Sequence, residues 1–263
     1  MNSAAVVVAN DLFGSLKRMP VAFHLAMNDI RGKYRRTVLG PLWIVIGQLA
    51  TVAGFVLVFS GLFNRNPYDY ALYLSAGFPV WMLISSFLTD MPGVFIQSKG
   101  FMESFELPWL SQVWRRSIGY LLVFGHQIAT LFVVMAVLRV APSWEMLWTI
   151  PALGLVLVSG AGLGIALGVL GARYRDLQPA MGVVASFLFF FSPIMWHADQ
   201  LHANHWVYLF NPIYYIVTLL RDPLLGHAPD PSIWIGAGLA AIASLAIGLI
   251  AFLLSRRRLY HWL

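Results

Sequence analysis

The feature that most constrains this chain is a set of six stretches that contain no Asp, Glu, Lys or Arg. A helix needs roughly 20 apolar residues to cross the hydrocarbon core of a bilayer, and five of the six stretches reach or approach that length. Because backbone polar groups must be satisfied within lipid, long unbroken apolar runs cross as helices rather than as strands. The six stretches are residues 39–63, 72–89, 118–138, 147–171, 181–196 and 233–254.

Composition identifies lipid as the solvent of these stretches. The chain is 59% apolar and only 11% charged, whereas soluble domains carry about 25% charged residues. The pI is about 9.8, but the basic residues flank the apolar stretches, which favours anionic lipid or an orientation signal over nucleic acid. The chain has no cysteine, which excludes disulfides and thiolate metal sites.

The Lys and Arg residues are distributed unevenly around the six predicted spans. With the N-terminus inside, fourteen of the 17 fall in inner segments, and the other three, Arg65, Arg139 and Arg221, fall in outer loops. This positive-inside bias predicts that both ends of the chain are cytoplasmic. The inner residues are Lys17, Arg18, Arg31, Lys33, Arg35, Arg36, Lys99, Arg115, Arg116, Arg173, Arg175, Arg256, Arg257 and Arg258.

The fifth stretch is short and carries Pro193 near its end, so we expect it to meet the outer side as a broken helix. A seventh span at residues 206–220 is the alternative topology. That segment is only 15 residues long and is interrupted by Asn211-Pro212, and its insertion would place the basic residues 256–258 outside. We therefore interpret the chain beyond Trp196 as a re-entrant outer element packed against protein.

The sequence thus predicts an all-α integral membrane protein with a single transmembrane domain over residues 1–263. It has six transmembrane helices, an N-terminal amphipathic interface helix and a re-entrant outer element between helices 5 and 6. The parts are a cytoplasmic interface arm at residues 10–37, a six-helix membrane domain at 39–254 and a cytoplasmic tail at 255–263. The apolar run at residues 4–9 is too short for a signal peptide.

The N-terminal arm carries an amphipathic helix pattern. Four apolar side chains fall at spacings of four, three and four, which places them on one helix face. Such a helix lies in the membrane interface with its basic side toward the head groups. Its basic residues serve as a topology anchor, and a sharper hypothesis is that they attract a phosphorylated lipid. The apolar residues are Phe23, Met27, Ile30 and Tyr34, and the basic ones are Arg31, Lys33, Arg35 and Arg36.

The inner loop at residues 91–117 contains a compact polar stretch, residues 97–106, which Leu107-Pro108 ends. A short helix stopped by proline at the cytoplasmic face is suited to docking a partner, and a plain connector fits the same pattern. The outer region contains aromatic residues that suit a membrane boundary or a sugar path. These are Trp196, Trp206, Tyr208, Phe210, Tyr214 and Tyr215.

Several sequence patterns argue against a metal site, an ATP site or ion-coupled transport in this chain. The histidines His197, His202 and His205 lack a Cys or acidic partner at a recognised metal spacing, so we predict no metal site. None of the three lysines belongs to a phosphate-binding loop, and the six stretches lack the carboxylates of an ion-driven carrier. His126 is the one histidine within the six stretches. Any energy source is therefore expected to come from another chain, or to be absent, and the sequence indicates no enzyme.

Small residues recur on one face of the fourth span, at Gly160, Gly164 and Gly168. This spacing lets two helices approach closely. It fits packing inside one subunit and also fits a dimer contact.

The segment DIRGKYRRTVLGPLW at residues 29–43 resembles the signature that opens the first span of ABC-2 type permeases, the polysaccharide-exporting ABC transporters. Further pieces agree in order along nearly the whole chain. Thr37 stands where Ser is usual and Gln48 where a proline is usual, so the resemblance does not carry a kink in the first span. The further pieces are Leu107-Pro108, RYRD at 173–176, SPI at 192–194, Asn211-Pro212 and Arg221.

The resemblance implies a homodimeric permease that binds two copies of an ABC ATP-binding subunit, with ATP and Mg²⁺ in that subunit and no cofactor bound here. The cargo would be an undecaprenyl-diphosphate-linked polysaccharide such as O-antigen, capsule or teichoic acid, exported across the bacterial inner membrane. The arm at residues 31–36, including Tyr34, would lie near the lipid diphosphate, and residues 196–225 would form the outer gate. The coupling residues would be Ser98, Lys99, Phe101, Glu103, Phe105 and Glu106.

Two alternatives share parts of this pattern. One is an ABC-2 exporter of a small molecule or drug, which has the same architecture and a different cargo. The other is a membrane-embedded transferase acting on lipid-linked sugars, which would need an acidic pair at the membrane surface. We find no convincing pair of that kind in the sequence.

Overall fold

The computed structural model describes residues 4–105, 107–198 and 206–263, and every regular element within them is helical. Five helical segments are long and apolar enough to cross a membrane. The sixth apolar helix, α8 (Leu177–Phe191), is short, as the sequence predicts. The five long segments are α3 (Leu42–Leu62), α4 with η1 and α5 (Pro67–Phe105), α6 (Leu110–Leu138), η2 with α7 (Trp144–Arg173) and α11, whose spanning part is Pro231–Arg256.

Proline and asparagine set the starts of the helices. Helix α4 (Pro67–Asp90) begins where the Asn66 side chain accepts a hydrogen bond from the Tyr68 backbone N–H, at 2.9 Å. Helix α10 (Pro212–Leu224) begins in the same way, with the Asn211 side chain accepting from the Ile213 N–H at 3.0 Å. Both pairs place an N-cap before a proline in the first turn, so Asn211-Pro212 starts a helix here.

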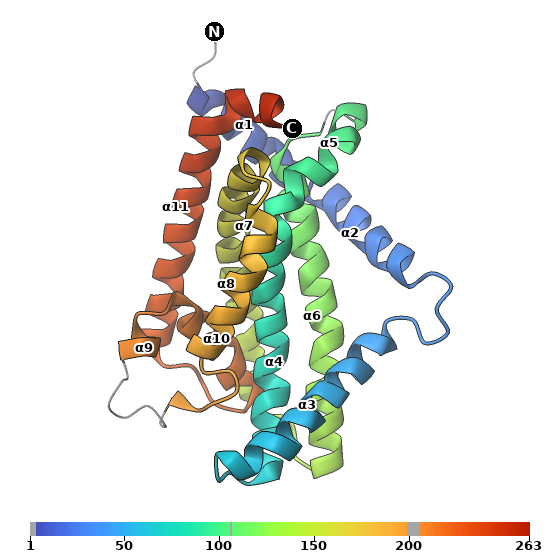
Figure 1. Cartoon of the computed structure of the whole chain (residues 1–263), viewed down its shortest axis with the longest axis vertical. Helices are drawn as coiled ribbons and strands as arrows, with labels where there is room; N and C mark the ends of the chain where they lie inside the picture. The colour runs from blue at the N-terminus through green and yellow to red at the C-terminus, as the bar shows by residue number, and fades with distance from the viewer. Residues whose placement is uncertain (1–3, 106, 199–205) are drawn as a thin grey trace.

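Helix α4 lies at the centre of the bundle, with α6 and α7 (Thr149–Arg173) beside it (Figure 1). Helix α11 (Pro231–Trp262) packs along α7 over most of its length. Glycines make that packing close: a Cβ at Gly162 would lie 2.5 Å from the Leu245 Cα. The remaining long helix, α3, crosses the lower halves of α4 and α6 and is mostly exposed in the single subunit.

The predicted glycine face of α7 packs within the subunit. A Cβ at Gly160 would lie 2.5 Å from the Phe87 ring, one at Gly164 would meet Met91, and one at Gly168 would lie 2.6 Å from Val94. These partners belong to α4, to η1 (Met91–Gly93) and to the start of α5 (Val94–Phe105). The glycine pattern therefore corresponds to close packing of α7 against α4, η1 and α5 of the same chain.

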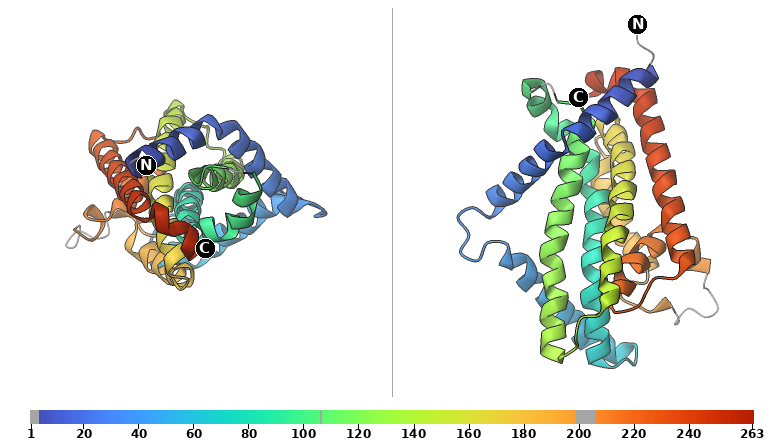
Figure 2. Two further views of the ribbon diagram at one scale, coloured as in Figure 1. Left: turned by 90° about the horizontal axis from the view of Figure 1, so that it is seen from above. Right: turned by 180° about the vertical axis from the view of Figure 1, so that it is seen from behind.

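The elements divide between two ends of the bundle. Helix α1 (Ala4–Lys17), α5 and the C-terminal end of α11 lie together at one end (Figures 1 and 2). We call it the inner end, after the side that the sequence predicts for these segments. At that end Arg173 lies over the Trp262 ring, 5.5 Å from its centroid. Helices α9 (Trp206–Leu209) and α10 lie toward the opposite end, together with η2 (Trp144–Trp148).

Helix α2 (Met19–Tyr34) slopes away from the inner end and is joined to α3 by an extended elbow (Figure 1). Two residues of the elbow have left-handed backbone angles, Arg36 (φ 75°) and Gly40 (φ 55°). Helix α3 then runs without interruption past Gln48, which is buried and whose amide atoms have no hydrogen-bond partner among the described residues.

Candidate functional site

Helix α2 packs against α6 through small residues. Ala22 and Ala26, one turn apart, are its buried residues. The predicted apolar face is offset by one residue from these alanines. On it, Phe23 is exposed, while Met27 and Ile30 are half-buried. The sequence predicts a helix here with its large apolar side chains toward the membrane interface, and it does not predict the contact of this helix with α6. The close contact uses the alanines, because only small residues let the two backbones approach.

Three of the four predicted basic residues of the arm line cavities, and they are divided between two different ones. Arg31, Tyr34 and Arg35 line a cavity of about 570 Å³ between α2, the elbow and α6, and His126 lies on its far wall. Lys33 lines a second cavity, of about 440 Å³, between α2, the end of α4, α5 and α6. Arg36 lines neither and is exposed in the elbow. The structure thus brings Arg31 and Arg35 together, one turn apart, and separates Lys33 from them.

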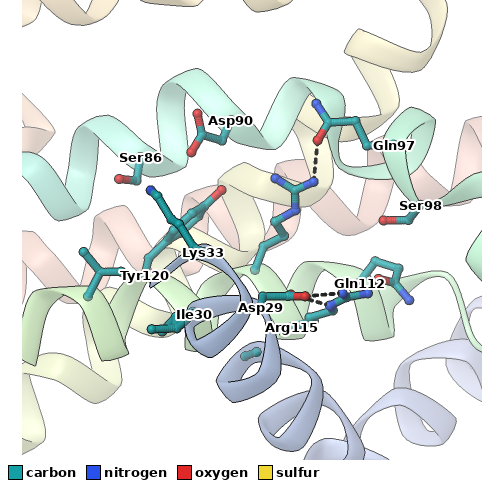
Figure 3. Close-up of a pocket in the computed structure, with 14 residues that line it drawn as sticks. Asp29, Ile30, Lys33, Ser86, Asp90, Gln97, Ser98, Gln112, Arg115 and Tyr120 are labelled. Atoms are coloured by element: carbon teal, nitrogen blue, oxygen red, sulfur yellow. Dashed lines mark hydrogen bonds and ion pairs between the residues drawn. The ribbon is translucent and has the colours of Figure 1, made fainter. Parts of the chain in front are cut away.

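The second cavity, the inner polar cavity, is lined by charged and amide side chains (Figure 3). Arg115 of α6 donates two hydrogen bonds to the Asp29 carboxylate of α2, at 2.7 and 2.6 Å. Its neighbour Arg116 donates to the Gln97 side-chain oxygen of α5 at 2.5 Å. Sequence analysis counted both arginines only as orientation signals. The one sequence feature that could have indicated a further role is that two arginines stand side by side at the start of a span.

The predicted short helix is present as α5, which is described up to Phe105 and lies just before Leu107-Pro108. Its predicted contact residues divide by burial. Glu103 and Phe105 are exposed, the latter to 62%, while Lys99 lies 5.9 Å from the Tyr260 ring centroid. Ser98 is buried and lines the inner polar cavity. Phe101 is half-buried, and Glu106 lies outside the described residues.

Helix α1 is not predicted from the sequence, and it is anchored on the start of α6 and on α11. Its Asp11 carboxylate accepts hydrogen bonds from the Trp109 and Leu110 backbone N–H groups at 3.3 and 3.1 Å, and it lies 3.6 Å from Arg256 of α11. One turn on, Ser15 accepts from the Trp114 indole at 3.2 Å. The signal was an acidic residue in a mostly apolar run, with a hydroxyl four residues later.

Burial governs the protonation of this anchor. Asp11 is only 8% exposed, and its desolvation raises the pKa of the carboxyl above the usual value of 3.8, against the lowering effects of the Leu110 N–H and Arg256. The anchor therefore joins α1, α6 and α11 at a group whose charged form is disfavoured by burial.

At the opposite end, a buried arginine holds the chain that follows α8. Arg221 of α10 is 6% exposed and donates to the Tyr73 hydroxyl and to the Pro193 carbonyl, both at 2.6 Å. The Tyr73 hydroxyl is 2.9 Å from the Pro193 and Trp196 carbonyls, and the Tyr70 hydroxyl donates to the Met195 carbonyl at 2.8 Å. We call these residues the outer latch.

The predicted aromatic residues lie around this latch. Trp196, Tyr208, Tyr214 and Tyr215 form a continuous row, with successive ring centroids 6.5, 4.9 and 5.2 Å apart. Trp206 and Phe210 are exposed, and neither belongs to that row of contacts. The row is held in place because the Tyr215 hydroxyl donates to the Leu209 carbonyl at 2.9 Å.

The histidines of the outer region do not come together as a metal site within the described residues. The His197 ring stacks on Tyr73, with centroids 3.7 Å apart. His202 and His205 lie outside the described residues. In the part of the chain that the structure describes, no three His, Cys, Asp or Glu side chains gather in a way that could hold a metal ion.

Comparison with known proteins places these features in a family context. The family model described as "ABC-2 type transporter" matches residues 21–225. The O-antigen export system permease protein RfbA of Klebsiella pneumoniae is 24% identical over 201 residues, 74% of this chain and 76% of that protein. The polysialic acid transport protein KpsM of Escherichia coli is 20% identical over 208 residues, 76% of this chain and 80% of that protein.

Proposed function

The chain belongs to the ABC-2 type transporter family, and we propose that it is the membrane-spanning permease subunit of an ATP-driven exporter of a lipid-linked polysaccharide. With this family and five helices of spanning length, it is an integral membrane protein. The proposed class of cargo rests on the two relatives described above. One is named for O-antigen and the other for polysialic acid, and each aligns with about three-quarters of the chain. The two named glycans differ, so we propose for this chain only the class that they share, a polysaccharide.

The topology we propose has six spans, α3, α4, α6, α7, α8 and α11, with α9 and α10 as the re-entrant outer element. The inner end would be cytoplasmic. Its support is the positive-inside bias of the sequence and the gathering of α1, α5 and the end of α11 on one side. Reporter fusions after Leu263 and within residues 202–205 should report opposite sides of the bacterial inner membrane. Fusions that report the same side would rule out this topology.

The energy would come from a separate ATP-binding subunit that holds ATP and Mg²⁺, two copies serving a homodimer of this chain. We place the contact with that subunit on α5, where Glu103 and Phe105 are exposed beside the inner polar cavity. An exposed aromatic next to a carboxylate suits a protein contact, because aromatics are enriched in interfaces.

The lipid diphosphate would bind at the inner interface in the cavity lined by Arg31, Tyr34 and Arg35. Two arginines one turn apart present planar guanidinium groups that can each bind phosphate oxygens bidentately. Lys33 and Arg36 would contribute positive charge near the membrane surface, where each is worth about 1 kcal/mol toward anionic lipid.

The glycan would leave along the subunit face formed by α3, α4 and α8. An open groove of about 520 Å³ lies there and is lined largely by aromatic rings, among them Phe55, Trp81 and Phe189. Aromatic faces pack against the apolar faces of sugars, and a second copy of the chain would close the groove into a channel. The aromatic row beside the outer latch would form the gate on the far side.

Deletion of the gene in its bacterial host tests this function. We expect surface glycan to disappear and lipid-linked glycan to accumulate inside the cell, with both effects reversed by the wild-type gene and by no other permease of the host. Unchanged surface glycan, together with lost resistance to a small toxic compound, would instead identify an exporter of small molecules.

A further inference from the structure

Arg115, in the inner polar cavity, contacts both α2 and α5. Its Nε and Nη2 atoms donate to the two oxygens of Asp29 on α2, at 2.7 and 2.6 Å. Its guanidinium carbon lies 5.0 Å from the centroid of the Phe101 ring on α5. One face of the guanidinium therefore covers an α5 ring while its edge is bound to α2.

Phe101 connects this contact to the exposed face of α5. The Phe101 and Phe105 rings are neighbours, with centroids 4.8 Å apart, and Phe105 is exposed together with Glu103. A displacement of that exposed face consequently moves the ring on which Arg115 lies.

The charges of the cavity favour a link between helices over a binding site for an anion. Its three cations, Lys33, Arg115 and Arg116, face two carboxylates, Asp29 and Asp90. Arg115 is already neutralised by Asp29, and Arg116 is bound to Gln97. With charge almost balanced, an added anion would compete with carboxylates already in place.

We propose that Arg115 is a positioning residue that transmits movement of α5 to the arm α2, so that nucleotide binding in the partner subunit reorients Arg31 and Arg35. This inference rests on the proposed function, because it takes α5 as the ATPase contact and α2 as the lipid-phosphate arm. A bidentate guanidinium–carboxylate pair suits the task because it fixes orientation as well as distance.

The exposure of the pair is consistent with a transmitting role. The Arg115 and Asp29 side chains are 21% and 53% exposed, and exposed ion pairs contribute little to stability. The pair can therefore break and re-form during a transport cycle without unfolding α2, which also packs on α6 through Ala22 and Ala26.

The test uses a fluorescent reporter on the arm. The chain has no cysteine, so H24C provides a single labelling position, exposed in the middle of α2 and five residues from Asp29. The labelled permease is assembled with its ATPase subunit in lipid nanodiscs. Bimane emission is then recorded without nucleotide and with ATP trapped by vanadate, and ATP hydrolysis is measured in the same samples.

Four variants separate the link from the fold. R115Q and D29N each remove one half of the pair, and D29R/R115D restores it in reverse. R116Q removes a neighbouring charge that donates to Gln97 of α5. We expect the nucleotide-dependent emission change to fall about fivefold or more in R115Q and D29N, the low end of typical coupling between sites. It should be partly restored in D29R/R115D and retained in R116Q.

The contrary results are equally specific. A wild-type complex that assembles and hydrolyses ATP without any change at the label would show that the arm does not move, and would overturn the inference. An equal change in R115Q, D29N and the wild type would do the same. If R115Q does not assemble, D29N, which leaves α6 untouched, decides alone. Failure of the wild type to bind any ATPase subunit would instead contradict the proposed function.

Discussion

The inner and outer ends of this bundle are held together in different ways. At the inner end, α2 is joined to α6 by the Asp29–Arg115 pair beside an open polar cavity, and both side chains are partly exposed. At the outer end, Arg221 is buried against Tyr73 and the carbonyl of Pro193. One arginine binds a carboxylate across water-accessible space. The other donates to a hydroxyl and a carbonyl within the packed core, with the Asp222 carboxylate 3.5 Å from its Nε.

The difference indicates which end can change shape. Exposed ion pairs exchange readily with water, whereas a buried arginine with directed hydrogen bonds is expensive to leave unpaired. The inner end is therefore suited to movement during a transport cycle. The outer latch fixes the chain after α8 to α4 and α10, so an outer gate would move with this cluster as a unit.

Replacing Arg221 should give the largest loss of stability. R221M removes the two hydrogen bonds that Arg221 donates within the latch. It should destabilise the fold by about 2–4 kcal/mol, seen as low abundance in membranes and a lower unfolding temperature in detergent. R221K should be intermediate, because lysine cannot reproduce the planar fork. R139Q, which changes an exposed outer arginine, serves as the control. Equal stability of R221M and R139Q would contradict the comparison.

Replacing the arm arginines by lysine should affect transport and not stability. R31K/R35K keeps the charge of the cavity but loses bidentate contact with phosphate, so export should fall about tenfold, the equivalent of ~1.4 kcal/mol. Surface glycan and permease abundance are measured together, with R18K as the charge-preserving control. Export at the wild-type level would leave the arm as a membrane anchor and nothing more.

Reversing the charge of Glu103 should weaken assembly with the ATPase subunit. Because Glu103 is exposed on α5, E103K should leave the fold intact and reduce capture of the partner by roughly fivefold, for a change of about 1 kcal/mol. The measurement is affinity purification from membranes. The matched control is D69K, at an exposed position on the outer end of α4. Normal capture by E103K would exclude this face of α5.

The smallest effect concerns the α1 anchor and depends on pH. Folding raises the pKa of Asp11, chiefly through burial, so its stabilising contribution is complete below the unfolded value and is lost as pH rises through the raised value. The wild type should therefore gain stability relative to D11N on acidification from about pH 7 to pH 4, by about 1 kcal/mol or less. Unfolding temperatures of both proteins across that range provide the measurement. A relative loss on acidification would show that the ion pair with Arg256 dominates.

The helices could be predicted from the sequence because their signals are local. Charge-free stretches located the long helices, Pro193 marked the short end of α8, and the residues before Leu107-Pro108 formed the expected α5. Periodicity on the arm predicted a helix with Phe23 and Met27 on its membrane face, and it did not predict the packing of α2 on α6. The pattern detects large apolar side chains, whereas the contact with α6 is made by Ala22 and Ala26.

The pairings that build the candidate site could not be predicted in this way. Asp29 and Arg115 are 86 residues apart, and Tyr73 and Arg221 are 148 apart. No local sequence pattern indicates which helix faces pack against each other. The glycines show the same limit, since their spacing announced a close contact on α7 but did not identify Phe87 and Met91 as its partners.

The most direct test of the central claim is transport by the purified components. Permease and ATPase subunit are reconstituted in vesicles with undecaprenyl-diphosphate-linked glycan from the host, and the fraction of glycan protected from external periodate is measured over time. We predict that protection rises only when the permease, the ATPase subunit and hydrolysable ATP are all present. Protection that does not depend on ATP, or that never develops with all three, would contradict the account.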